Sequence, residues 1–280
     1  MKRSRQHRAA EDSERDYVLG TDAGEIERLR IQHEAWRPIV LDAWRRAGVA
    51  PGDRALDVGS GPGWAAFDLA EIVGPKGSVC ALERSARFVS AGRAFAAERG
   101  VQNVSFREVD LMLDAFPAGG FDAAWCRWVC SFVDSPQTLV TKIADALRPG
   151  GVAVFHEYAD YGSWRFSPAL PQVHAHIQAI MTSWREAGGE PDIGMQLLPM
   201  VRAAGLQVRE VVPRVYCVRP GEPLWLWIAT FLRSSFDRLL ELQVCGPEHA
   251  ERAERELAAA ERDADTVLLT PLVLEILAER

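Results

Sequence analysis

The sequence predicts an α/β protein in which a mostly parallel sheet carries helices on both faces. Short apolar segments alternate with helical segments from Pro51 to Phe155, which is the pattern of repeated strand–helix–strand units. A loop with three glycines, Gly59 to Gly63, directly follows the first apolar segment. Glycines at the carboxyl end of a strand let the backbone turn tightly and approach a ligand closely, so this loop is the first candidate for a binding site.

The composition is that of a globular protein whose partner is not a polyanion. Of the 280 residues, 48% are hydrophobic and 25% are charged, which is enough for a buried core. The net charge of −7 argues against nucleic acid as a partner, because nucleic-acid binding depends on a basic surface. The basic start has no apolar stretch after it, and no run of about 18 apolar residues occurs. We therefore expect a cytoplasmic protein without a membrane partner.

The first 50 residues predict a tail and a helical cap. Residues 1–16 are polar and mixed in charge, and we expect them to be disordered. Asp22 and Glu25 have the spacing of a capping box, so a helix should begin there. Pro38 can open a second helix. We therefore expect residues 17–50 to form a cap of two helices before the sheet.

From residue 51 to residue 280 we expect one domain, in which strands and helices alternate as far as Phe155. The strands are expected at 55–58, 78–82, 104–109, 121–126 and 152–155, and the helices between them at 63–73, 86–99 and 136–147. Each of these helices is followed by a glycine or a Pro-Gly pair, which is a usual stop signal.

The alternation changes after the fifth strand. Residues 161–204 contain two helical stretches without a strand between them, at the place beyond the strand ends where open α/β sheets bind ligands, so we expect a helical lid. A strand is expected at 206–217, where Pro213 favours a sheet edge or a bulge. A helical insertion at about 222–264 and a final strand at 272–278 follow.

The glycine loop distinguishes between two kinds of nucleotide site. A dinucleotide site has the order G-x-G-x-x-G, whereas this loop has G-x-G-x-G, and Trp64 stands where the third glycine should be. Pyrophosphate binding is therefore disfavoured. With Asp57 in front of it, the loop resembles the first motif of class I S-adenosylmethionine (SAM) dependent methyltransferases, which reads acidic-x-G-x-G-x-G.

The resemblance continues along the next strands and implies a Rossmann-like seven-stranded sheet whose last strand is antiparallel. Glu83 ends the second strand and matches the family's ribose-binding carboxylate, and Asp110 with Leu111 stands where the family holds adenine. Tyr17 and Gln32 in the cap can hydrogen-bond the methionine end of the cofactor. The residues that we expect to contact SAM are Tyr17, Gln32, Asp57, Gly59, Ser60, Gly61, Gly63, Glu83, Arg84, Asp110, Leu111 and Arg127.

Few catalytic residues can be inferred, because methyl transfer can proceed by alignment and desolvation without a strong base. His156 follows the fifth strand, and a histidine can deprotonate a substrate near neutral pH, so it is the candidate base. The alternative is a histidine that holds a loop carbonyl. Trp128, Tyr158 and Trp164 fall near the expected site and are candidates for substrate contacts, with simple packing as the alternative for the tryptophans.

The spacing of potential ligands predicts no metal site. His174 and His176 lie two apart on an expected helix and therefore point to different faces. The five cysteines form no C-x-x-C pair. We therefore expect no bound metal.

These features together predict a SAM-dependent methyltransferase that acts on an oxygen, nitrogen or carbon nucleophile of a small organic molecule. The acidic charge and the lid favour a secondary metabolite over a macromolecule. Two alternatives stay open: an NAD(P)-dependent oxidoreductase of the Rossmann type, and a protein that binds SAM without transferring its methyl group. The sequence also leaves a homodimer open.

Overall fold

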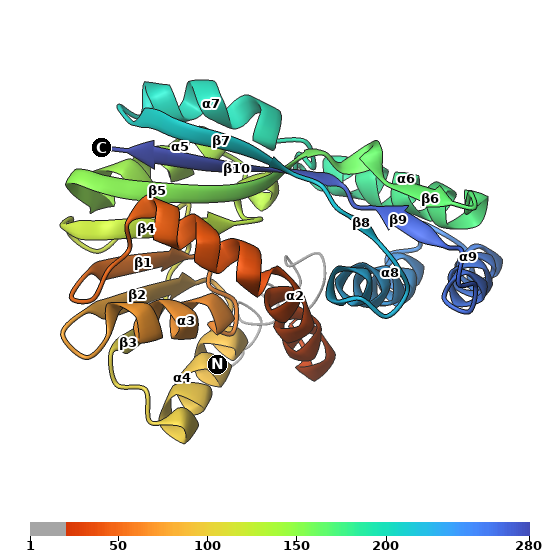
Figure 1. Ribbon diagram of the computed structural model, residues 1–280, viewed down its shortest axis with the longest axis horizontal. Helices are drawn as coiled ribbons and strands as arrows, with labels where there is room; N and C mark the ends of the chain where they lie inside the picture. The colour runs from red at the N-terminus through yellow and green to blue at the C-terminus, as the bar shows by residue number, and fades with distance from the viewer. Residues whose placement is uncertain (1–20) are drawn as a thin grey trace, which may run out of the picture.

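The structure, a computed structural model, describes residues 21–280, so the expected tail and Tyr17 lie outside the described residues. Its core is a seven-stranded sheet in the order β3-β2-β1-β4-β5-β10-β7 (Figure 1). The strands are β1 (Arg54–Val58), β2 (Ser78–Glu83), β3 (Val104–Glu108), β4 (Phe121–Arg127), β5 (Leu147–Asp160), β7 (Gln207–Arg214) and β10 (Leu272–Glu279). Strands β1 to β5 pair in parallel, and β10 runs antiparallel to both of its neighbours. The predicted fold class is therefore confirmed.

Helices cover both faces of this sheet, because successive residues along each strand point to opposite faces and both faces are apolar. These helices are α2 (Ala23–Ala47), α3 (Trp64–Val73), α4 (Ala86–Arg99), α5 (Pro136–Ala146) and α7 (Gly194–Ala203). In β1, Ala55 belongs to the apolar cluster that contains α2 and α3, while Leu56 and Val58 belong to the cluster that contains α5 and α7. The glycine loop lies at the carboxyl ends of the parallel strands.

Helix α2 runs without a break through Pro38, so the prediction of two cap helices was wrong. Proline inside a helix costs about 3 kcal/mol, because its ring removes one hydrogen bond and crowds the preceding turn. Trp36 and Val40 on the inner face of α2 are completely buried, which outweighs that cost. The start of the helix has the expected cap, since the Asp22 carboxylate accepts a hydrogen bond from the Glu25 amide at 2.9 Å.

A second group of elements, which we call the arm, lies beside the main sheet. It consists of the helices α6 (Pro171–Glu186), α8 (Pro223–Glu241) and α9 (Pro247–Ala260) and a three-stranded sheet of β6 (Arg165–Ser167), β9 (Val267–Leu269) and β8 (Cys217–Val218). Figure 1 shows the arm to the right of the main sheet, with α2 next to α8. Its strands were not predicted, because two or three residues are too few to show an alternating pattern. Within residues 21–280, no helix combines the length and the apolar content needed to span a bilayer.

The segment expected as a lid, residues 161–204, divides between two surroundings. Helix α6 belongs to the arm, whereas α7 lies on the main sheet against β5, β7 and β10. Leu197 and Val201 of α7 are completely buried, because the sheet extends beyond the area that α5 can cover. Only the part of this segment up to α6 therefore faces the strand ends. Pro213 lies in β7 at the edge of the sheet, as its sequence context indicated.

Candidate functional site

The glycine loop is a rigid turn at the ends of β1 and β2. Gly59, Gly61 and Gly63 all have positive φ, of 69°, 54° and 93°. The amides of Gly59 and Ser60 both donate to the Leu82 carbonyl at 2.9 Å, which ties the loop to β2. A Cβ atom on Gly59 would lie 2.4 Å from Cγ2 of Val129, so this position has no room for a side chain. The loop therefore needs glycine both for its conformation and for its packing.

Glu83 has a structural task in addition to its expected one. Its Oε2 accepts a hydrogen bond from the Gly61 amide and its Oε1 accepts one from the Ser85 amide, each at 2.8 Å. Burial raises the pKa of this carboxyl, while the amide hydrogen bonds oppose the rise. The same carboxylate lines the cavity described below. Glu83 therefore holds the loop in shape and remains able to accept further hydrogen bonds from a ligand.

Asp57 and Arg127 are buried groups of opposite charge with incomplete hydrogen bonding. Among the described residues, Oδ2 of Asp57 and Nη1 of Arg127 have no hydrogen-bond partner. Burial raises the pKa of Asp57 to about 7, against the effect of the Arg127 guanidinium, and Glu83 adds to the rise. Burial likewise lowers the pKa of Arg127 to about 10. Since both residues line the cavity, the unsatisfied atoms are suited to a ligand that carries both charges.

The loop after β3 is held by its own side chains. Oδ1 of Asp110 accepts hydrogen bonds from the amides of Met112 and Leu113, at 2.8 and 3.1 Å. Nζ of Lys142 donates to the carbonyls of Leu111 and Met112 at 2.8 Å. Asp110 and Leu111 are thereby presented to the cavity on an ordered turn.

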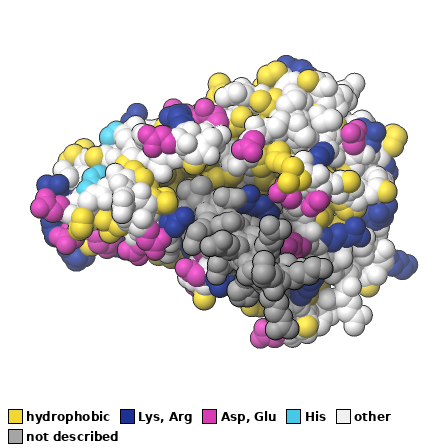
Figure 2. Space-filling model, turned by 180° about the vertical axis from the view of Figure 1, so that it is seen from behind, with side chains coloured by type: hydrophobic (Ala, Val, Ile, Leu, Met, Phe, Trp, Pro, Cys, Tyr) yellow, Lys and Arg dark blue, Asp and Glu magenta, His cyan; other side chains and the backbone are white. Residues whose placement is uncertain are grey.

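One cavity of about 630 Å³ connects these strand ends to the arm. Of the residues expected at the site, it is lined by Gln32, Asp57, Gly59, Ser60, Gly61, Glu83, Arg84, Asp110, Leu111, Arg127, Trp128 and Tyr158. Its far end is lined by aromatic residues of the arm and of the segment after β5, namely Tyr161, Trp184 and Phe231. Figure 2 shows hydrophobic side chains bordering the hollow between the arm and the body that carries the main sheet. The cavity thus has a polar end at the strand tips and an aromatic end at the arm.

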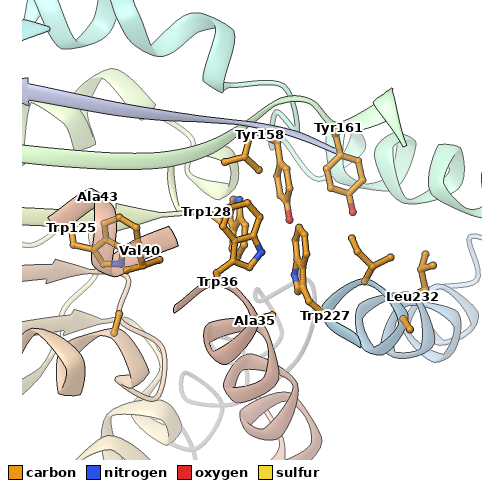
Figure 3. Packing of buried hydrophobic residues seen from close by; sticks show 14 of the residues in the cluster. Ala35, Trp36, Val40, Ala43, Trp125, Trp128, Tyr158, Tyr161, Trp227 and Leu232 are labelled. Atoms are coloured by element: carbon orange, nitrogen blue, oxygen red, sulfur yellow. The ribbon is translucent and has the colours of Figure 1, made fainter. Parts of the chain in front are cut away.

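Trp128 stands where the two ends meet. Its ring stacks on Tyr158 with centroids 5.3 Å apart and on Trp227 at 5.4 Å, while Trp36 meets it edge-on (Figure 3). Its φ of 52° is rare for a bulky side chain. The backbone of Trp128 is held at this φ because its amide donates to the His156 carbonyl at 2.9 Å and because its ring is packed between the rings of Tyr158 and Trp227. The constrained tryptophan therefore forms a fixed wall of the cavity.

His156 does not lie at the cavity, which corrects its assignment as the base. Its side chain points to the α2 face of the sheet, where it is completely buried with its ring centroid 4.7 Å from that of Trp125. Its Nε2 lies 2.6 Å from Oε2 of Glu275. The other carboxylate oxygen, Oε1, accepts hydrogen bonds from Arg46 and Arg214. Burial lowers the pKa of His156, against the effect of Glu275. This histidine is part of a buried charge network that joins α2 to β10.

Three other expected site residues have different surroundings from those predicted. Trp164 is buried against Tyr161, with ring centroids 5.5 Å apart, and does not line the cavity. Gly63 serves as the N-cap of α3 and is not part of the lining. Gln32 lines the cavity, but its Oε1 accepts hydrogen bonds from Arg28 and Trp227 at 3.0 and 3.2 Å. Gln32 therefore connects the cap to α8.

His33, one turn before Trp36 on α2, also lines the cavity. It is buried, with Nε2 at 3.1 Å from Oδ2 of Asp68 and Nδ1 at 3.3 Å from Nη2 of Arg127. Because the guanidinium can only donate, Nδ1 is the acceptor and Nε2 carries the proton. Burial lowers the pKa of His33, against the effect of Asp68. Its spacing along α2 shows only that it shares a face with Trp36, so no sequence signal could have indicated this partner set.

The order of the sheet, the glycine loop after β1 and the carboxylates of Glu83 and Asp110 are those of the class I SAM-dependent methyltransferase fold. A family model described as "Methyltransferase domain" matches residues 55–151 of this chain. The matched segment runs from β1 to the turn within β5. It therefore contains the glycine loop, Glu83 and Asp110.

Two curated relatives are methyltransferases from bacteria of the genera Saccharothrix and Streptomyces. The chain is 36% identical to nocamycin O-methyltransferase of Saccharothrix syringae over 118 residues, which are 42% of each chain. It is 30% identical to aklanonic acid methyltransferase of Streptomyces sp. (strain C5) over 140 residues, which are 48% of this chain and 63% of the relative. The chain thus matches less than two thirds of the length of each relative.

Solved structures share the fold over most of the chain. The crystal structure of the [4+2]-cyclase SpnF matches with a TM-score of 0.56 and 22% identity, over 87% of this chain and 80% of that chain. At this identity the likeness concerns the fold alone. A protein described as a cyclase and this chain therefore have the same architecture.

Proposed function

We propose that this protein binds SAM at the polar end of the cavity and transfers its methyl group to an oxygen, nitrogen or carbon nucleophile of a small organic molecule at the aromatic end. The observation that carries the proposal is that both ends belong to one cavity of about 630 Å³. Sites for small molecules have volumes of about 300–1,000 Å³. SAM supplies a methyl group on a sulfonium, which is the electrophile of the reaction.

At the polar end, each part of SAM would face residues at the end of a different strand. Asp57 and Arg127 offer unsatisfied atoms of opposite charge, which suit the α-ammonium and the α-carboxylate of the methionine part. Glu83 would accept the ribose hydroxyls with the lone pairs that the loop amides leave unused. Asp110 and Leu111 would hold the adenine, on the turn after β3.

The aromatic end indicates the class of acceptor. Tyr158, Tyr161, Trp184 and Phe231 supply flat apolar surface, which favours a planar or conjugated small molecule, and Trp128 would separate it from the cofactor. The relatives are named for nocamycin and aklanonic acid, which supports a small acceptor. The residues of the chain would align the acceptor and exclude water, an effect worth up to about 7–11 kcal/mol in well-oriented systems.

Calorimetry with SAM and with NADH, followed by incubation with methyl-labelled SAM, tests this function. We expect SAM to bind with a micromolar Kd, NADH to give no heat, and label to appear in one or more members of a panel of hydroxylated and amino-substituted aromatic compounds. Binding of NADH without binding of SAM would show that the oxidoreductase alternative is correct. Tight SAM binding with no labelled product from a cell extract or the panel would favour the alternative of a SAM-binding protein.

The affinity for SAM should increase as the pH rises toward 7. The pKa of Asp57 is about 7, and an ammonium beside it favours the ionised form, so binding should tighten by about tenfold between about pH 5.5 and pH 7.0. This window lies below the range of about 7.7–8.0 in which an α-amino group itself titrates. For folding the sign is opposite: the raised pKa means that the contribution of this carboxyl to stability is complete below its ordinary value of 3.8 and is lost as the pH rises through about 7.

The measurement is the Kd for SAM by calorimetry at several pH values. The control is Asp57→Asn, which keeps the shape of the side chain but cannot titrate, and its Kd should not vary over the same window. Equal pH dependence in the wild type and in this variant would show that Asp57 does not face the ammonium.

A further inference from the structure

Three side chains of metal-binding types meet at the outer end of the arm. His176 lies on α6, Cys245 lies in the turn between α8 and α9, and His249 lies in the first turn of α9. One ligand atom from each lies within 4.8 Å of the other two. Cys245 and His249 have the spacing C-x-x-x-H and lie on either side of Gly246 and Pro247, where α9 begins. The spacing of His176 along the chain gives no sign of this group, because His176 is brought there only by the packing of α6 on α9.

The separation of the two histidine nitrogens in this group, which we call the His176 cluster, is close to an edge of a tetrahedral zinc site. Nδ1 of His176 lies 3.2 Å from Nε2 of His249. Zinc–nitrogen bonds of about 2.05 Å at the tetrahedral angle place two nitrogens about 3.3 Å apart, and a nitrogen and a sulfur about 3.6 Å apart. The observed nitrogen separation is thus the one that a shared ion would impose.

The hydrogen bonds around His176 fix which nitrogen is available. The Ser235 hydroxyl donates to the Leu232 carbonyl at 2.6 Å, so its oxygen is left to accept from Nε2–H of His176 at 2.9 Å. Nδ1 therefore carries the lone pair, and this lone pair faces His249. A ligating histidine whose other nitrogen donates to a fixed acceptor is the usual arrangement at metal sites.

We propose that Nδ1 of His176, Nε2 of His249 and Sγ of Cys245 bind one Zn²⁺ ion, with water as the fourth ligand. Two nitrogens and one thiolate are a ligand set that zinc prefers. His176 is buried, whereas Cys245 and His249 are partly exposed, so the ion has a route from solvent. On binding, the Cys245 thiol releases one proton to solvent and the proton of the His249 ring resides on Nδ1.

The ion would join the arm to the wall of the cavity. Ser235, which bonds His176, lines the cavity from α8, and the three ligands come from α6 and from the region of α9. A bound ion would therefore fix α6 relative to α9 and to the turn that follows α8. This role is independent of the proposed methyl transfer, since none of the three ligands lines the cavity.

The experiment uses the untagged full chain, stripped of metal with a chelator and kept reduced with a phosphine. It is titrated with Co²⁺ as a spectroscopic substitute and then with Zn²⁺. We expect one equivalent of Co²⁺ to give the visible bands of a tetrahedral ion and a near-ultraviolet thiolate-to-metal band, and one equivalent of Zn²⁺ to abolish both. Zn²⁺ should also raise the Tm, because it binds the folded state.

Matched variants test the assignment of the ligands. Cys245→Ser and His249→Gln should each weaken binding by about 100-fold or more, and Cys245→Ser should abolish the thiolate band. The controls Cys217→Ser and His174→Gln change an exposed cysteine and an exposed histidine and should bind like the wild type. All four variants should have the Tm of the metal-free wild type in the presence of chelator. A wild type that gives no thiolate band, or a His249→Gln variant with unchanged affinity, would show instead that the two histidines share only a hydrogen bond.

Discussion

Replacing Glu83 by alanine is expected to raise the Kd for SAM by about 100-fold or more. The variant loses the proposed ribose acceptor and also the carboxylate that holds the amides of Gly61 and Ser85. Hydrogen bonds to a charged group contribute about 1.5–3 kcal/mol each, so the loss of two to three of them exceeds the value expected from the ribose contact alone. The measurement is calorimetry with SAM, together with urea denaturation to confirm that the variant is folded.

Glu108→Ala is the matched control for this prediction. Glu108 lies directly beside Glu83 in the register of β2 and β3, but its side chain is exposed. The Kd of this variant should equal that of the wild type. If Glu83→Ala binds SAM within twofold of the wild-type value, Glu83 neither holds the loop nor contacts the cofactor.

Gly59→Ala is expected to lower the free energy of unfolding by about 2–5 kcal/mol and to remove measurable SAM binding. Alanine at a positive φ costs about 1–2 kcal/mol, and the φ of Gly59 is 69°. The new methyl group would in addition lie 2.4 Å from Cγ2 of Val129, and such overpacking costs about 1–3 kcal/mol. Urea denaturation measures the stability, and calorimetry measures the binding.

Two further variants separate backbone strain from the clash. Gly100 has nearly the same φ, 67°, and a Cβ atom there would have no neighbour within 4 Å, so Gly100→Ala should show the backbone cost alone. Adding Val129→Ala to Gly59→Ala removes the obstructing methyl groups and should restore part of the stability. Equal losses in Gly59→Ala and Gly100→Ala, with no recovery in the double variant, would mean that the contact with Val129 is not tight.

The strands of the main sheet and the polar end of the site could be predicted from the sequence, because both depend on local order along the chain. The apolar segments that form β1 to β5 are short and bounded by turn residues, and most residues of β1, β2, β4 and β5 are buried. Residues that follow neighbouring parallel strands meet at one edge of the sheet. Asp57, Glu83 and Asp110 could therefore be expected near one another before any coordinate was known, and all three line the cavity.

The residues whose surroundings were predicted wrongly share one physical cause. Their surroundings depend on burial against segments that are distant in the chain. Pro38 is accommodated because Trp36 and Val40 bury against the sheet. His156 was expected at the site because it follows a strand, but β5 continues to Asp160, so its end lies four residues further on. The charge of Glu275, on a strand more than a hundred residues away, determines the surroundings of that histidine.

The sequence by itself determined the class of the sheet, the glycine loop and the carboxylates beside it, since periodicity and spacing are local properties. The tertiary structure alone decided that Asp57 and Arg127 line the same cavity, that aromatic residues of the arm complete this cavity, and that His176 meets Cys245 and His249. These pairings join residues that are far apart in the chain. They arise because packing apolar surface chooses which helix faces meet, and no pattern within one segment contains that choice.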